Sequence, residues 1–225
     1  MNTLSLALYN EGSTDNRFLP PIIAKTARSI LDHHRQNHEG VSEIRIIEVR
    51  RKKRPESILQ AALAASGYHA LIVHADADHP QAYKARNERF EPGLQLVQQT
   101  NGDLCKNLLP IIPIQAIEAW MLADYQSLLM VIGTEMHPRE FGIPEKAYQV
   151  ESIAKPKRKL EEAMRKAYAS RTKRRRKTDI DFLYEPMGER ISLERLSQVS
   201  SYQQFIEDLT QTLENIELIP RIYRM

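Results

Sequence analysis

Two aspartates stand where a buried strand is expected to end. Asp76 and Asp78 follow the apolar run 70–73, which has the composition and length of a strand inside a sheet. Two carboxylates this close repel each other, which raises their pKa values unless a cation offsets the charge. An exposed turn that closes the strand is the other interpretation of the same residues. The positions of the remaining carboxylates bear on which interpretation holds.

Four apolar segments are expected to form strands, with amphipathic helices between them. These strands are expected at 3–10, 43–49, 70–73 and 108–114. The alternation is typical of an α/β protein with a mainly parallel, Rossmann-like sheet of about four strands flanked by helices. We divide the chain into an α/β catalytic core, 1–150, and a basic, mostly helical C-terminal extension, 151–225, that packs on the core.

Acidic residues gather at one predicted rim of this sheet. Ligands of parallel sheets bind outside the carboxyl ends of the strands. Glu11 follows the first expected strand, the aspartate pair follows the third, and Glu118 stands near the start of the helix after the fourth. Chain order therefore predicts a catalytic cluster of four carboxylates, namely Glu11, Asp76, Asp78 and Glu118.

Two neighbours of this cluster are harder to place. Asp15 is either a further ligand or an acid that stabilises the N-terminus of the helix that begins there. Strand alternation puts His74 on the same face as Asp76 if the strand continues that far, but we assign His74 no role.

The predicted cluster consists of carboxylates and contains no cysteine or histidine. A site with only oxygen ligands favours a hard cation, Mg²⁺ or Mn²⁺. We expect Glu11, Asp76 and Asp78 to bind it, with Glu11 either a ligand or the base that takes a proton from water. Glu118 is either a further ligand or structural. Cys105 is the one cysteine of the chain, which excludes an internal disulfide and a cysteine-based zinc site. A metal beside basic surface suits the hydrolysis of phosphate esters.

Positive charge is concentrated in two segments. The net charge is +3, yet 155–177 carries twelve Lys or Arg and two acids, and 50–54 is entirely basic. Such segregation predicts a polyanionic partner, most commonly nucleic acid, although charge runs are often only solvated surface. The residues expected to contact phosphate are Arg86, Lys155, Lys157, Arg174 and Arg175.

The motifs resemble those of the Toprim (topoisomerase–primase) superfamily. Glu11-Gly12-Ser13-Thr14-Asp15 and Asp76-Ala77-Asp78 are similar to its glutamate after the first strand and its Asp-x-Asp after the third. The sequence is more similar to small stand-alone Toprim-like bacterial proteins of an uncharacterised family, related to the overcoming-lysogenization-defect nucleases. Their Ile-Glu-Ala-Trp segment resembles Ile117-Glu118-Ala119-Trp120, and their Pro-Lys with a following leucine resembles Pro156-Lys157 and Leu160.

This resemblance implies a Toprim-like fold and a Mg²⁺-dependent nuclease that cleaves DNA or RNA with metal-activated water. It also implies an effector of antiviral or abortive-infection defence, controlled by an ABC- or SMC-type ATPase partner. The chain has no room for a topoisomerase cleavage domain and no zinc ribbon of the primase type, so neither of those activities is expected.

Two other functions stay open. One is a non-catalytic subunit that binds nucleic acid or an ATPase and uses its acidic rim structurally. The other is a metal-dependent phosphohydrolase with Asp76 as nucleophile, which the Glu-Gly after the first strand argues against. The N-terminal segment lacks the basic leader of a signal peptide, and no apolar run has the length of a membrane span, so we expect a soluble cytoplasmic protein. The choice of DNA or RNA and the oligomeric state stay open.

Overall fold

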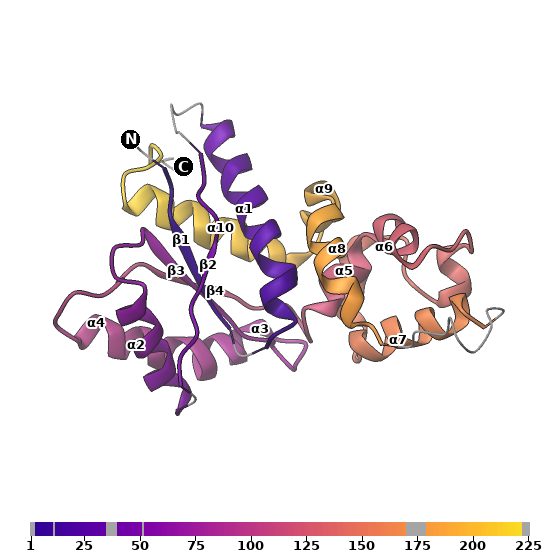
Figure 1. Ribbon diagram of the computed structural model, residues 1–225, viewed down its shortest axis with the longest axis horizontal. Coiled ribbons are helices and arrows are strands. Elements are labelled where there is room, and N and C mark those ends of the chain that lie inside the picture. The colour runs from indigo at the N-terminus through magenta and orange to yellow at the C-terminus, as the bar shows by residue number, and fades with distance from the viewer. Residues whose placement is uncertain (1–2, 11, 35–39, 51, 170–178, 222–225) are drawn as a thin grey trace.

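One parallel sheet with helices on both faces organises the molecule (Figure 1). The structure is a computed structural model, and it describes residues 3–10, 12–34, 40–50, 52–169 and 179–221 of the 225-residue chain. The expected α/β architecture with a helical C-terminal part is confirmed.

The sheet has the strand order β2-β1-β3-β4. Its strands are β1 (Leu6–Tyr9), β2 (Arg45–Ile46), β3 (Ala70–His74) and β4 (Leu108–Ile111). All neighbours pair in parallel, so the carboxyl ends of the four strands meet at one edge. In the central register Leu8 pairs with Ile72, and Ile72 pairs with Leu109.

Two pairs of helices cover the two faces of the sheet. α1 (Asp15–His33) and α10 (Ser200–Asn215) cover one face, and α2 (Arg54–Ala64) and α4 (Glu91–Gln99) cover the other. The even-numbered apolar residues of β1 and β3 pack under α1 and α10, and the odd-numbered residues of both strands pack under α2 and α4. This period-two alternation in continuous apolar strands is what a sheet buried on both faces requires.

The chain leaves β1 and β3 toward opposite faces of the sheet. α1 follows β1 on one face, whereas α4 follows β3 on the other. In open parallel sheets, ligands bind in the crevice between two such strands, outside their carboxyl ends. The topology therefore singles out the gap between the ends of β1 and β3.

The helix between β3 and β4 contains a wide turn. It consists of α3 (Ala82–Ala85), the π-helical turn η1 (Arg86–Phe90) and α4. Pro92 accounts for this turn, because its nitrogen carries no hydrogen and its ring clashes with the carbonyl four residues earlier. π-turns within helices are frequent at functional sites.

The remaining helices form a group beside the sheet, and Figure 1 shows the chain returning from it through α10. They are α5 (Glu118–Ala123), α6 (Tyr125–Ile132), η2 (Pro138–Phe141), η3 (Ala147–Ser152), α7 (Pro156–Ala167), η5 (Asp181–Leu183), α8 (Tyr184–Arg190) and α9 (Leu193–Leu196). α8 packs against α1, and α10 packs against β4. The domain boundary predicted between 150 and 151 falls inside η3 and stays a prediction. Within the described ranges, no helix combines the length and hydropathy that crossing a membrane requires.

Candidate active site

A buried histidine joins the ends of β1 and β3. His74 is 3% exposed, and its Nδ1 lies 3.2 Å from Oδ2 of Asp15, the first residue of α1. Its Nε2 lies 3.4 Å from Oδ1 of Asp76. Because Nε2 has no hydrogen-bond partner among the described residues, this second contact is electrostatic. Asp15, His74 and Asp76 thus bridge the gap that the topology singles out.

The charge of His74 depends on these two carboxylates. Burial alone would lower the pKa of His74, because a charged imidazolium is poorly solvated inside the protein. The side chains of Asp15 and Asp76 outweigh burial and raise the pKa to about 9. His74 is therefore positively charged at neutral pH and offsets part of the negative charge at this rim. The sequence signal for His74 was the strand alternation that places it on the face of Asp76.

Asp76 is fixed from the start of α5. The Ile117 N–H donates to Asp76 Oδ1 over 2.9 Å, so one carboxylate oxygen is oriented by the backbone that opens this helix. The Asp76 side chain is 33% exposed, and the other carboxylate oxygen has no partner within the described part of the chain.

Asp78 lies where the pairing of the segments that follow β3 and β4 ends. Its N–H donates to the Gln115 carbonyl over 2.9 Å, and both residues have left-handed backbones, with φ of 51° for Asp78 and 66° for Gln115. This conformation is uncommon for residues other than glycine, although aspartate tolerates it better than most. Oδ2 of Asp78 lies 2.8 Å from a terminal nitrogen of Arg89.

A cleft of about 400 Å³ opens beside Asp78. Asp78 and Gln115 line it from the sheet, and Lys155, Lys157 and Arg158 line it from the first turn of α7. α7 begins at Pro156, since proline is tolerated at the first helical position. The structure thus brings Lys155 and Lys157, two of the predicted phosphate contacts, to the same cleft as Asp78.

Glu118 is buried and hydrogen-bonded. It is 6% exposed, and the Tyr184 hydroxyl donates to its Oε1 over 2.5 Å. Burial raises the pKa of Glu118; the Tyr184 hydrogen bond and the charge of Lys157 act against this, whereas the charge of Asp76 adds to it. The helix α8 therefore contributes Tyr184 to the neighbourhood of Asp76. No local pattern pointed to Tyr184, which is 66 residues from Glu118.

The other predicted site residues are placed differently. Arg86 pairs with Asp208 of α10 at 2.9 Å and with Glu91 at 3.3 Å, so its guanidinium binds carboxylates of the protein itself. Its contact with phosphate stays a prediction. The remaining predicted residues, Glu11, Arg174 and Arg175, lie outside the described residues. Within the described part, no three His, Cys, Asp or Glu side chains are grouped to hold a metal ion.

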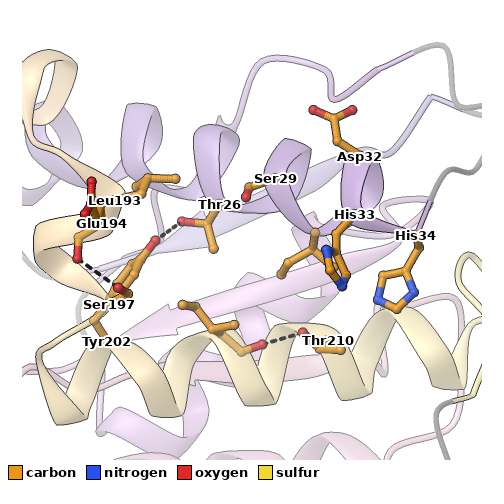
Figure 2. Close-up of a pocket in the computed structure, with 12 residues that line it drawn as sticks. Thr26, Ser29, Asp32, His33, His34, Leu193, Glu194, Ser197, Tyr202 and Thr210 are labelled. Atoms are coloured by element: carbon orange, nitrogen blue, oxygen red, sulfur yellow. Dashed lines mark hydrogen bonds between the residues drawn. The ribbon is translucent and has the colours of Figure 1, made fainter.

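A larger cleft lies toward the far end of α1 and contains none of these residues (Figure 2). It measures about 720 Å³ between α1, α9 and α10. His33 and His34 line it, with ring centroids 5.5 Å apart and edge-to-face, and the Tyr202 hydroxyl and Thr26 Oγ1 are hydrogen-bonded within it at 2.6 Å. This cleft takes no part in the candidate active site.

Comparison with known proteins places the chain in a family. Residues 10–210 match the family described as Domain of unknown function (DUF4276). The chain belongs to the DUF4276 family. The matched range runs from the end of β1 into α10, and so includes Asp15, His74, Asp76 and the cleft beside Asp78. No curated protein and no solved structure shows a significant match.

Proposed function

We propose that this DUF4276 protein is a Mg²⁺-dependent nuclease that hydrolyses phosphodiester bonds in DNA or RNA. The observation that carries the proposal is the cleft in which Asp78 and the basic residues Lys155 and Lys157 lie together. Metal-dependent hydrolysis of a phosphodiester uses carboxylates that hold the metal and cations that hold the phosphate, side by side.

Two of the described carboxylates offer oxygen atoms of the kind that a hard divalent cation prefers. Asp78 Oδ1 and the second oxygen of Asp76 have no partner among the described residues, and carboxylate oxygens are what Mg²⁺ and Mn²⁺ prefer. Asp76 and Asp78 would hold the ion, together with Glu11 from outside the described ranges. When bound, the cation supplies charge neutralisation at the phosphate and a more acidic water molecule.

The protein's own groups would bind and orient the substrate. Lys155 and Lys157 would contact phosphate oxygens at the N-terminus of α7, where the helix dipole also favours negative charge. Glu118 and Tyr184 would hold the start of α5, and the N–H of Ile117, the residue just before this helix, orients Asp76. We therefore assign Glu118 a positioning role.

The resemblance to overcoming-lysogenization-defect nucleases extends the proposal to a biological setting. We propose an effector of antiviral or abortive-infection defence that an ABC- or SMC-type ATPase controls. The support for this setting is the three motifs and their order in the chain. The isolated protein is then expected to cleave weakly until its partner is present.

One observation favours the non-catalytic alternative. Ile117 and Arg89 already hold Asp76 and Asp78, as they would in a purely structural acidic rim that binds nucleic acid or an ATPase. A metal-dependent phosphohydrolase is the second alternative, and it would act on small phosphate esters instead of strands.

A cleavage assay tests the proposal against both alternatives. The full chain, alone and with any ATPase that co-purifies, is incubated with end-labelled single-stranded DNA, duplex DNA and RNA. We expect strand cleavage with Mg²⁺ or Mn²⁺ and none with EDTA. Absence of metal-dependent cleavage under every condition would contradict the nuclease. Hydrolysis of p-nitrophenyl phosphate without strand cleavage would support the phosphohydrolase instead.

Nucleic-acid binding by α7 is expected to depend steeply on salt. The double variant Lys155→Gln/Lys157→Gln should bind single-stranded DNA more weakly, and the slope of log K against log[salt] should decrease by about 1.4, because each lost phosphate contact removes about 0.7. Fluorescence anisotropy over a salt series measures both quantities.

Lys106→Gln is the matched control, since Lys106 is exposed just before β4, at the opposite edge of the sheet. It should leave the slope unchanged. An equal slope for the double variant and the wild type would mean that this part of α7 is solvated surface.

A further inference from the structure

Arg89 reaches the loop between the two site aspartates with two separate contacts. One terminal nitrogen donates to the backbone carbonyl of Asp76 over 2.7 Å, and the other lies 2.8 Å from Asp78 Oδ2. The planar guanidinium has fixed donor directions, so these two contacts together set the distance and orientation between the loop backbone and the Asp78 carboxylate.

A second arginine supports the first. Arg54, the first residue of α2, donates through Nε to the Arg89 carbonyl over 2.8 Å and through a terminal nitrogen to the His74 carbonyl over 2.7 Å. Two arginines from the face covered by α2 and α4 therefore bind this segment. Arg54 binds the His74 carbonyl, and Arg89 binds the Asp76 carbonyl and the Asp78 carboxylate.

Arg89 lies in the wide turn η1, from which its side chain contacts the loop that contains Asp76 and Asp78. Arg86 and Arg89 both belong to this turn, yet Arg86 pairs with Asp208 of α10 whereas Arg89 contacts the loop after β3. Each of the two arginines on one turn thus has its own target.

We propose that Arg89 is a positioning residue that holds the Asp76–Asp78 loop in the geometry the active site uses. The catalytic part of this inference rests on the proposed nuclease function, whereas the structural part does not. Asp78 has a left-handed backbone, a conformation that persists only where surrounding contacts enforce it. Arg89 supplies two of those contacts.

The effect of removing Arg89 should be local. The side chains of Arg89 and Asp78 are 37% and 64% exposed, and ion pairs this exposed contribute little to global stability. Arg89→Ala should therefore fold with an unchanged circular dichroism spectrum and nearly the wild-type melting temperature. The loop should instead open more often. The amides of Ala75, Ala77 and Asp78 report on it, because they donate to carbonyls at the end of β4 and in the segment that follows it.

Hydrogen exchange of the full chain measures this opening. In Arg89→Ala we expect the amides of Ala75, Ala77 and Asp78 to exchange about tenfold faster than in the wild type, since local opening sets their protection. Arg89→Lys should restore protection only in part, because an ammonium lacks the fork that spans both acceptors. Arg86→Ala is the matched control from the same turn and should leave these amides unchanged. Equal exchange in Arg89→Ala and Arg86→Ala would overturn the proposal.

Cleavage kinetics add a readout that a purely structural contact would not move. Arg89→Ala should lower kcat for strand cleavage while KM and the salt dependence of binding stay at the wild-type values, because Arg89 faces the loop and not the phosphate. A raised KM with a smaller salt slope would overturn the positioning role and make Arg89 a phosphate contact. If the wild type itself does not cleave, the proposed function fails, and the exchange experiment still decides on Arg89.

Discussion

Alanine at position 188 is expected to destabilise the protein, although alanine favours helices more than glycine does. Gly188 lies in α8 where it meets α1, and a Cβ there would stand 2.6 Å from the Phe18 carbonyl oxygen and 3.1 Å from the Phe18 Cα. Both are backbone atoms, so no side chain can turn aside and the helices must separate. Helix propensity alone predicts a gain of about 0.5–1 kcal/mol, whereas overpacking costs about 1–3 kcal/mol. We predict a net loss in the free energy of unfolding.

Chemical denaturation measures this loss, and Glu185→Ala is its control. Glu185 is exposed on the same helix, so its replacement should change the free energy of unfolding by less than about 0.5 kcal/mol. A Gly188→Ala variant as stable as the wild type, or more stable, would contradict the close approach of α8 to α1.

The same contact reaches the candidate active site. α8 carries Tyr184, whose hydroxyl holds Glu118 in α5, and the backbone just before α5 orients Asp76. Separation of α8 from α1 should therefore disturb the Tyr184–Glu118 hydrogen bond as well. A loss of activity in the Gly188 variant could therefore come from the altered packing alone. The variant tests the packing of α8 on α1 and does not test the catalytic chemistry.

Asparagine at position 76 is expected to abolish metal-dependent strand cleavage. Asp76→Asn keeps the size of the side chain and one oxygen for the Ile117 N–H. It removes the negative charge that lies beside His74 and that the proposed cation would need. Loss of a single electrostatic group at a catalytic centre typically costs about 10²–10³ in kcat. We predict a loss of at least this size in the cleavage assay.

Asp103→Asn is the matched control for this variant. Asp103 is exposed in the loop between α4 and β4, at the opposite edge of the sheet from Asp76. The Asp103→Asn variant should cleave nucleic acid as the wild type does. Asp103→Asn and Asp76→Asn should both keep the wild-type circular dichroism spectrum. Wild-type cleavage by Asp76→Asn would remove Asp76 from the site.

The strands and the acidic rim could be predicted because they depend on short stretches of sequence. The run 70–73 is apolar on both faces, and the topology follows from alternating strands and helices, so Asp76, Asp78 and Glu118 were expected at one edge. The charge pattern indicated only a polyanionic partner for the basic segment; that Lys155 and Lys157 line the same cleft as Asp78 comes from the structure.

The partners of these residues were beyond local patterns. Tyr184 bonds Glu118 across 66 residues, and Arg86 pairs with Asp208 across 122, distances over which no periodicity carries information. Arg89 reaches its loop through a π-turn, which is rare and has no periodic signature of its own. The charge of His74 depends on Asp15, which precedes it in the chain by 59 residues.

The most direct test of the metal site is anomalous diffraction at the manganese edge, from crystals of the full chain grown with Mn²⁺. We predict a peak about 2.0–2.6 Å from carboxylate oxygens of both Asp76 and Asp78. In crystals of Asp76→Asn the same peak should be lost. Manganese bound elsewhere, with none between Asp76 and Asp78, would contradict the proposed metal-dependent nuclease site.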